Sequence, residues 1–241
     1  MRVAYLVPFL LAASACSSGS QPLATPSATP SPSPSVVATT AAPTPTPTVS
    51  PTPAPTTAAP TRPPAADGDV DGDGTPDAVK ATADLITVTL SKSGSKVTAP
   101  VHTDGPAAPE VLGSKDVDRD GHAEIFLKTV QGASTGFATP YRYDGKVLRE
   151  LRLAGEPALL GFGGSTQHGD GFTCTQAGLI QVRSATADGT GSTYTVKVDT
   201  YRLTATDLVK AKPQTVSQAK QGSPEVEAAY ALDCGSVGEG G

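Results

Sequence analysis

Two acidic segments of the chain share the pattern D-x-D-x-D-G-x-x-[D/E]. One runs from Asp69 to Asp77 and the other from Asp116 to Glu124, so they begin 47 residues apart. Alternate side chains of such a loop point inward, and the glycine at position 6 permits a sharp turn that brings the carbonyl of position 7 to the same centre. A shell of hard oxygen ligands is what Ca²⁺ prefers. The spacing therefore predicts two calcium-binding loops.

The predicted ligands occupy positions 1, 3, 5, 7 and 9 of each loop. In the first loop they are Asp69, Asp71, Asp73, the Thr75 carbonyl and Asp77, and in the second they are Asp116, Asp118, Asp120, the His122 carbonyl and Glu124. The alternative is a pair of polar turns whose Asp and Gly residues merely suit the backbone, and the matched register of the two loops argues against it. Because four crowded carboxylates repel one another, we expect each loop to depend on a cation for stability.

The residues that follow the two loops exclude an EF-hand, which closes with Glu at position 12 and is flanked by helices. Position 12 is Lys80 in the first loop and Leu127 in the second, and strand-forming residues follow both. The loops resemble those of FG-GAP and VCBS-type repeats, known from integrin-like β-propellers, and the chain is similar to actinobacterial lipoproteins that carry such repeats. This resemblance covers residues 67 to about 130, and it implies blade-like β-sheets that bind Ca²⁺.

From residue 67 onward the chain has the apolar–polar alternation and β-branched content of strands. Strands are expected over 85–90, 125–127, 141–143, 146–151, 179–183 and 194–203, and a helix over 224–232. The segment before Leu179 lacks acidic ligands, and three repeats are too few to close a propeller. We therefore expect an all-β fold of antiparallel, blade-like sheets in an incomplete β-propeller-like or β-sandwich arrangement, preceded by a disordered stalk.

Residues 1–15 have the features of a signal peptide, with Arg2 followed by a short apolar run. The run ends Ala-Ser-Ala before Cys16, which resembles the bacterial lipobox and implies lipidation of Cys16 and attachment to the outer face of the cytoplasmic membrane. Ordinary cleavage at the same place, with release of the protein, is the alternative. Residues 16–66, rich in Pro, Thr, Ser and Ala, are expected to form a disordered linker, and its O-glycosylation is a further hypothesis.

The chain contains three cysteines. Cys174 and Cys234 both lie in the domain expected over 67–241 and can pair in an oxidising compartment, which leaves Cys16 for lipidation. The bridge would close a loop of about 60 residues, which by chain entropy contributes roughly 4 kcal/mol. A redox pair would more often have the spacing C-x-x-C, so we expect a structural role.

Charge and motif content narrow the class of function. From residue 67 onward there are 16 basic and 23 acidic residues, a formal net charge of −7, which excludes the basic footprint of a nucleic-acid-binding protein. The run that contains Ser165, His168 and Asp170 has no nucleophile elbow. We therefore expect a non-enzymatic, monomeric surface protein that serves adhesion, envelope structure or binding of a cell-wall or extracellular ligand. The alternative is a hydrolase of cell-wall polysaccharide, which needs two facing carboxylates.

Overall fold

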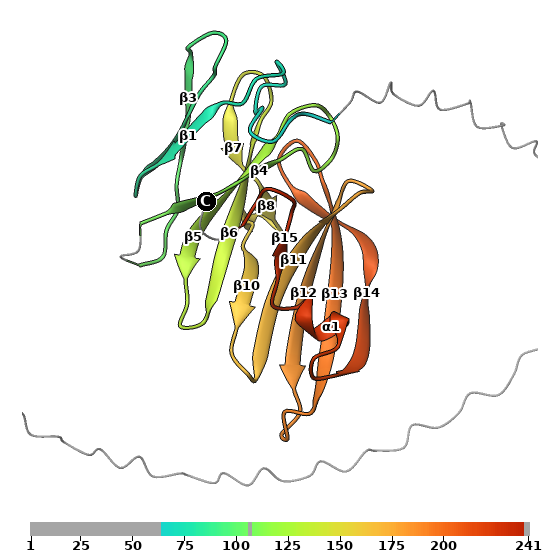
Figure 1. Ribbon diagram of the computed structural model, residues 1–241. Helices are drawn as coiled ribbons and strands as arrows, with labels where there is room; N and C mark the ends of the chain where they lie inside the picture. Colours follow the sequence, from blue (N-terminus) through green and yellow to red (C-terminus); the bar gives the residue numbers. More distant parts are fainter. Residues whose placement is uncertain (1–63, 106–107, 239–241) are drawn as a thin grey trace, which may run out of the picture. The chain divides into compact units, whose positions relative to one another are not determined.

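A computed structural model describes residues 64–105 and 108–238 (Figure 1). The fold is nearly all β, as predicted, and its strands pair antiparallel except where β15 (Leu232–Asp233) joins β11 (His168–Thr175). The expected helix over 224–232 is reduced to α1 (Pro224–Glu227), because the chain turns after it and Leu232 pairs with Phe172 of β11 instead. The predicted signal peptide, Cys16 and most of the linker lie outside the described residues.

The smaller sheet follows the first acidic loop. It is an antiparallel meander of β1 (Ala78–Ala81), β2 (Leu85–Thr89) and β3 (Lys96–Pro100). The alternating pattern of β2 buries Ile86 and Val88, and both pack in one apolar cluster with Ile125, Leu127 and Tyr141 of the larger sheet. The two sheets therefore pack face to face, in a sandwich-like arrangement.

The larger sheet has ten strands and the order β14-β13-β12-β11-β10-β6-β5-β4, with β7 paired to β6 and β15 paired to β11. The remaining members are β4 (Glu110–Lys115), β5 (Glu124–Gln131), β6 (Thr135–Tyr143), β7 (Leu148–Glu150), β10 (Leu160–Gly164), β12 (Leu179–Ala187), β13 (Thr193–Leu203) and β14 (Leu208–Lys220). A separate two-stranded hairpin joins β8 (Arg152–Leu153) to β9 (Glu156–Pro157). Because β4 and β14 are the two ends of this order, the sheet does not close into a barrel.

The largest apolar cluster among the described residues is formed mainly by side chains of the larger sheet and of the C-terminal segment. The rings of Phe126 and Phe172 stack with centroids 5.8 Å apart, and Phe162 meets Phe172 edge to face. Gly136 makes room for the Phe162 ring, since a Cβ at that position would lie 2.6 Å from it. The C-terminal segment covers this core between β11 and β4, where the Gly238 N–H donates to the Leu112 carbonyl at 2.9 Å.

Candidate metal centres

The first acidic loop leads directly into β1, and the second connects β4 to β5. In each loop the carboxylates of positions 1, 3 and 9 come together. Asp69, Asp71 and Asp77 each offer one oxygen to a group whose atoms all lie within 4.8 Å of one another, and Asp116, Asp118 and Glu124 do the same. These two groups, called here the first and the second cluster, could each hold a metal ion.

The backbone wraps each loop around its own carboxylates. Asp69 accepts hydrogen bonds from the N–H groups of Asp73 (2.9 Å) and Gly74 (2.8 Å), and Asp77 accepts one from the Val70 N–H at 2.9 Å. The wrapping requires left-handed backbone at positions 4 and 6. Both positions are glycines in the first loop, whereas the second loop has Arg119 (φ 62°) at position 4.

The second cluster is the more deeply buried one. Asp116 is 4% exposed and Glu124 is fully buried. One oxygen of Asp116 accepts from the Gly121 N–H at 3.0 Å and one oxygen of Glu124 accepts from the Val117 N–H at 3.0 Å. The other oxygens, Asp116 Oδ1 and Glu124 Oε1, are buried and accept no hydrogen bond from the described residues. An oxygen in that position costs about 1–3 kcal/mol unless a partner compensates it.

Burial and, after it, carboxylate crowding shift pKa values in both loops. Burial, followed by the charge of Asp118, raises the pKa of Glu124 well above its usual range. Burial and the negative charges of Asp77 and Asp73 raise the pKa of Asp71 as well, against a hydrogen bond from the Asp73 backbone that lowers it. A bound cation would instead lower these pKa values, because it favours the ionised carboxylates.

The position-5 residues, predicted as ligands, are not brought into either cluster. Asp73 accepts a hydrogen bond from the Thr75 N–H at 2.8 Å, and Asp120 accepts one from the His122 N–H at 2.9 Å. Both side chains thus bridge to the backbone two residues on, which fixes the turn. The carbonyls of Thr75 and His122 stay predicted ligands, while the His122 ring lies with Nδ1 3.3 Å from the Val70 carbonyl oxygen.

The two loops contact each other. The Ala123 N–H of the second loop donates to the Asp69 carbonyl at 2.9 Å, and the Ala65 N–H, just before the first loop, donates to Asp116 Oδ2 at 2.8 Å. A ligand residue of each cluster therefore accepts a hydrogen bond from the other loop or from the residues just before it.

One residue of the second site was not predicted from the sequence. Arg142 of β6 donates from Nη1 to Asp118 Oδ2 at 2.6 Å and from Nη2 to Asp120, and Nη1 lies 3.8 Å from Glu124 Oε1. Burial opposes the charged guanidinium, but the hydrogen bond to Asp118 and the charge of Glu124 outweigh it and raise the pKa of Arg142. The alternation of strand β6 predicts only that Arg142 lies on the opposite face from Tyr141, and not which loop it meets.

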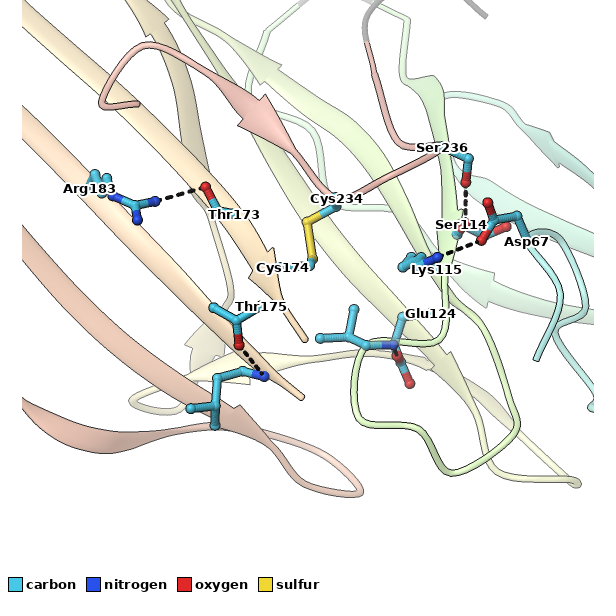
Figure 2. The surroundings of a disulfide bond; sticks show 12 residues. Asp67, Ser114, Lys115, Glu124, Thr173, Cys174, Thr175, Arg183, Cys234 and Ser236 are labelled. Atoms are coloured by element: carbon cyan, nitrogen blue, oxygen red, sulfur yellow. Dashed lines mark hydrogen bonds and ion pairs between the residues drawn. A yellow bond between two sulfur atoms is a disulfide. The ribbon is translucent and has the colours of Figure 1, made fainter. Parts of the chain in front are cut away.

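The disulfide between Cys174 and Cys234, with Cα atoms 4.6 Å apart, confirms the predicted pairing (Figure 2). It ties the C-terminal segment to β11. Beyond it, Ser236 donates a hydrogen bond to the Ser114 carbonyl at 2.9 Å on β4, two residues before the second loop. A Cβ at Gly178, in the turn after β11, would lie 3.3 Å from the Val117 carbonyl. The disulfide and the second loop thus belong to one packed region.

The segment with Ser165, His168 and Asp170 forms a His–carboxylate contact without a nucleophile. His168 Nε2 lies 3.0 Å from Asp170 Oδ2, whereas the Ser165 hydroxyl oxygen accepts a hydrogen bond from the Gln167 N–H. Elsewhere, the carboxylate of Glu150 lies 2.8 Å from His102 Nδ1. Neither arrangement is the pair of facing carboxylates that a glycosidase needs.

Within the described part of the chain, no helix has the length and hydropathy needed to cross a bilayer. No family model matches the chain, and neither a curated protein nor a solved structure shows significant similarity to it. Function is therefore inferred from the residues of the two clusters.

Proposed function

We propose that the chain binds Ca²⁺ at both acidic loops, and that it is an exported, lipid-anchored envelope protein whose calcium-stabilised β domain serves adhesion, envelope structure or ligand binding. The observation that carries the metal proposal is the second cluster. Its two buried oxygens, Asp116 Oδ1 and Glu124 Oε1, have no hydrogen-bond donor among the described residues. A cation is the partner that would satisfy both oxygens together.

The donor set favours calcium over other cations. All six side chains of the two clusters are carboxylates, which suits a hard cation and not zinc, for which Cys and His are the usual ligands. Calcium accepts six to eight oxygens at about 2.3–2.6 Å in a flexible geometry, whereas magnesium requires a near-ideal octahedron. A loop that combines three clustered carboxylates with backbone carbonyls fits the calcium requirement.

The role of the ion would be structural. Asp77 directly precedes β1 and Glu124 is the first residue of β5, so an ion shared by positions 1 and 9 would fasten the start of each strand to the beginning of its loop. A site filled at 100 times its Kd adds about 2.7 kcal/mol of stability. Extracellular calcium modules commonly bind at about 10⁻⁴ to 10⁻³ M, which suits a protein outside the cytoplasm.

Export and anchoring are supported by independent features. The Cys174–Cys234 disulfide is typical of an oxidising compartment. The expected signal peptide and the lipobox-like sequence before Cys16 would place the protein on the outer face of the cytoplasmic membrane, and the linker up to residue 66 would hold the β domain away from it. The loop pattern supports the FG-GAP/VCBS-type assignment.

A thermal melt of the full chain in EGTA and in millimolar Ca²⁺ tests the metal proposal. Calcium should raise Tm by several degrees, and Asp71→Asn and Asp116→Asn should each lose part of that rise. Asp84→Asn is the matched control, because Asp84 is exposed and lies outside both loops. A Tm that does not change with calcium, or a rise that both loop variants keep in full, would reject the proposal.

A further inference from the structure

The two clusters differ in the cations that the protein itself places beside them. The Arg142 side chain is 12% exposed and contacts three carboxylates of the second loop, those of Asp118, Asp120 and Glu124. In the first loop, the cation is Lys92, whose 61% exposed side chain lies 3.6 Å from Asp73. Among the described residues, no Lys or Arg forms an ion pair with the three carboxylates of the first cluster.

Arg142 also takes up an oxygen of a predicted ligand. Asp118 Oδ1 accepts a hydrogen bond from the Asp120 N–H at 3.2 Å, and Asp118 Oδ2 accepts the one from Arg142 at 2.6 Å. Both oxygens of this carboxylate are therefore engaged by the protein. An ion that binds the second cluster must share Asp118 with the guanidinium, and it must do so at a site where burial strengthens charge repulsion.

We propose that Arg142 is a tethered counter-cation of the second loop, which makes the two calcium sites unequal. The first loop binds calcium more tightly. The second loop binds it more weakly, because the ion competes with Arg142 for Asp118 and is repelled by its charge. This inference rests on the proposed calcium-binding function and adds to it an order of filling and the residue that sets that order.

The surroundings of Arg142 allow it to give way to an ion. Its Nη1 also lies 3.4 Å from the Thr204 carbonyl, and its Nη2 is bonded to Asp120, which is outside the second cluster. A guanidinium that releases Asp118 therefore keeps two partners. At low calcium the second loop retains its shape through Arg142, whereas the first loop has only the exposed Lys92 to offset its charge.

Isothermal titration calorimetry with CaCl₂ on the full chain tests the inference. The Asp71→Asn background removes a carboxylate from the first cluster, so the remaining heat reports the second loop. In that background Arg142→Gln should lower the Kd at least about tenfold, which corresponds to about 1.4 kcal/mol of repulsion and competition removed. The matched control is Arg149→Gln, since Arg149 pairs with Arg142 across β6 and β7 but contacts Asp144. It should leave the Kd within twofold.

Two further variants keep the test decisive. Arg142→Lys retains the positive charge, so the Kd of the second loop should stay close to its value with Arg142. This variant separates the effect of charge from that of altered packing. In the Asp116→Asn background, which disables the second cluster, Arg142→Gln should not change the Kd of the first loop. Far-UV circular dichroism of each variant checks that the sheet is intact.

The outcomes separate the inference from the function on which it rests. If calcium binds both loops but Arg142→Gln leaves the second Kd unchanged or raises it, the counter-cation role is wrong and the calcium function stands. If no variant binds calcium, both are wrong. If the original chain binds one ion and Arg142→Gln binds two, the counter-cation role holds in its strongest form.

Discussion

Glu124→Gln should lower the stability of the domain in calcium but leave it nearly unchanged, or raise it, in EGTA. Without calcium, burial and the charge of Asp118 oppose ionisation of the Glu124 carboxyl group and raise its pKa. Arg142, 3.8 Å from Oε1, offsets its negative charge only in part, and Oε1 accepts no hydrogen bond from the described residues. Gln removes that charge and keeps an oxygen that can accept from the Val117 N–H. We therefore expect the free energy of unfolding in EGTA to stay within about 1 kcal/mol of wild type or to rise.

With calcium, the same substitution removes a charged ligand of the second cluster. A site filled at 100 times its Kd contributes about 2.7 kcal/mol, and about 1 kcal/mol shifts Tm by roughly 2–4 °C in a domain of 150–250 residues. Loss of the site should therefore reduce the calcium-induced rise in Tm by roughly 5–11 °C. The assay is differential scanning calorimetry of the full chain in EGTA and in calcium.

The control for this substitution is Glu156→Gln, which removes an exposed carboxylate in β9, outside both loops. It should behave as wild type in both buffers. If Glu124→Gln destabilises the domain equally in EGTA and in calcium, then Glu124 acts only by holding the Val117 N–H, and the reasoning about a calcium ligand is refuted.

Two other predictions concern features outside the clusters. Replacing Cys174 and Cys234 together by Ser should lower the free energy of unfolding in urea by about 4 kcal/mol, since the bridge closes a loop of roughly 60 residues; an unchanged urea midpoint would contradict it. The Val147 backbone hydrogen bond and the Arg149 side chain lower the pKa of Asp144 to about 2 from its usual 3.8, so its stabilising effect is full above pH 3.8 and is lost as the pH falls towards 2. The Tm difference between wild type and Asp144→Asn should shrink over that interval, and a constant difference would argue against the shift.

The all-β fold could be predicted because alternation and β-branching mark the strands whose inner face is buried. The segments around Val88 and Val196 are of this kind, whereas the segment around Leu127 is a continuous apolar run buried on both faces, and each lies in a strand. Strand β14 carries no such signal. It is an edge strand of thirteen residues, most of them exposed, with Lys and Gln on its surface, and its pairing with β13 supplies the order that its composition does not.

Strands β10 and β11 were not predicted for a different reason. Both are rich in glycine, which has low strand propensity. The absence of a side chain is required at Gly169, because a Cβ there would lie 2.5 Å from the ring of Tyr230, which packs against this position. Close approach of a distant residue decides the structure at such positions, and a single sequence does not reveal which residue approaches.

The same distinction applies to the candidate sites, where the loop sequence predicts some features and contacts from distant segments decide others. The pattern itself orients positions 1, 3 and 9, because the backbone of each loop wraps around its own carboxylates, and these positions form both clusters. The position-5 carboxylates of Asp73 and Asp120 accept hydrogen bonds from the Thr75 and His122 N–H groups and lie outside both clusters. The position-3 carboxylates accept the same kind of bond and lie inside them, so this local bond alone does not decide which carboxylates meet.

The cations that balance the carboxylates come from elsewhere in the chain. Lys92 follows β2, and Arg142 lies on β6. Two loops with one pattern therefore stand in different electrostatic surroundings. Binding strength depends on those surroundings as much as on the ligands, because a buried positive charge within 4 Å of a ligand oxygen competes directly with the ion. The motif predicts where calcium would bind, and under the proposal above the charged residues supplied by other segments would set how tightly.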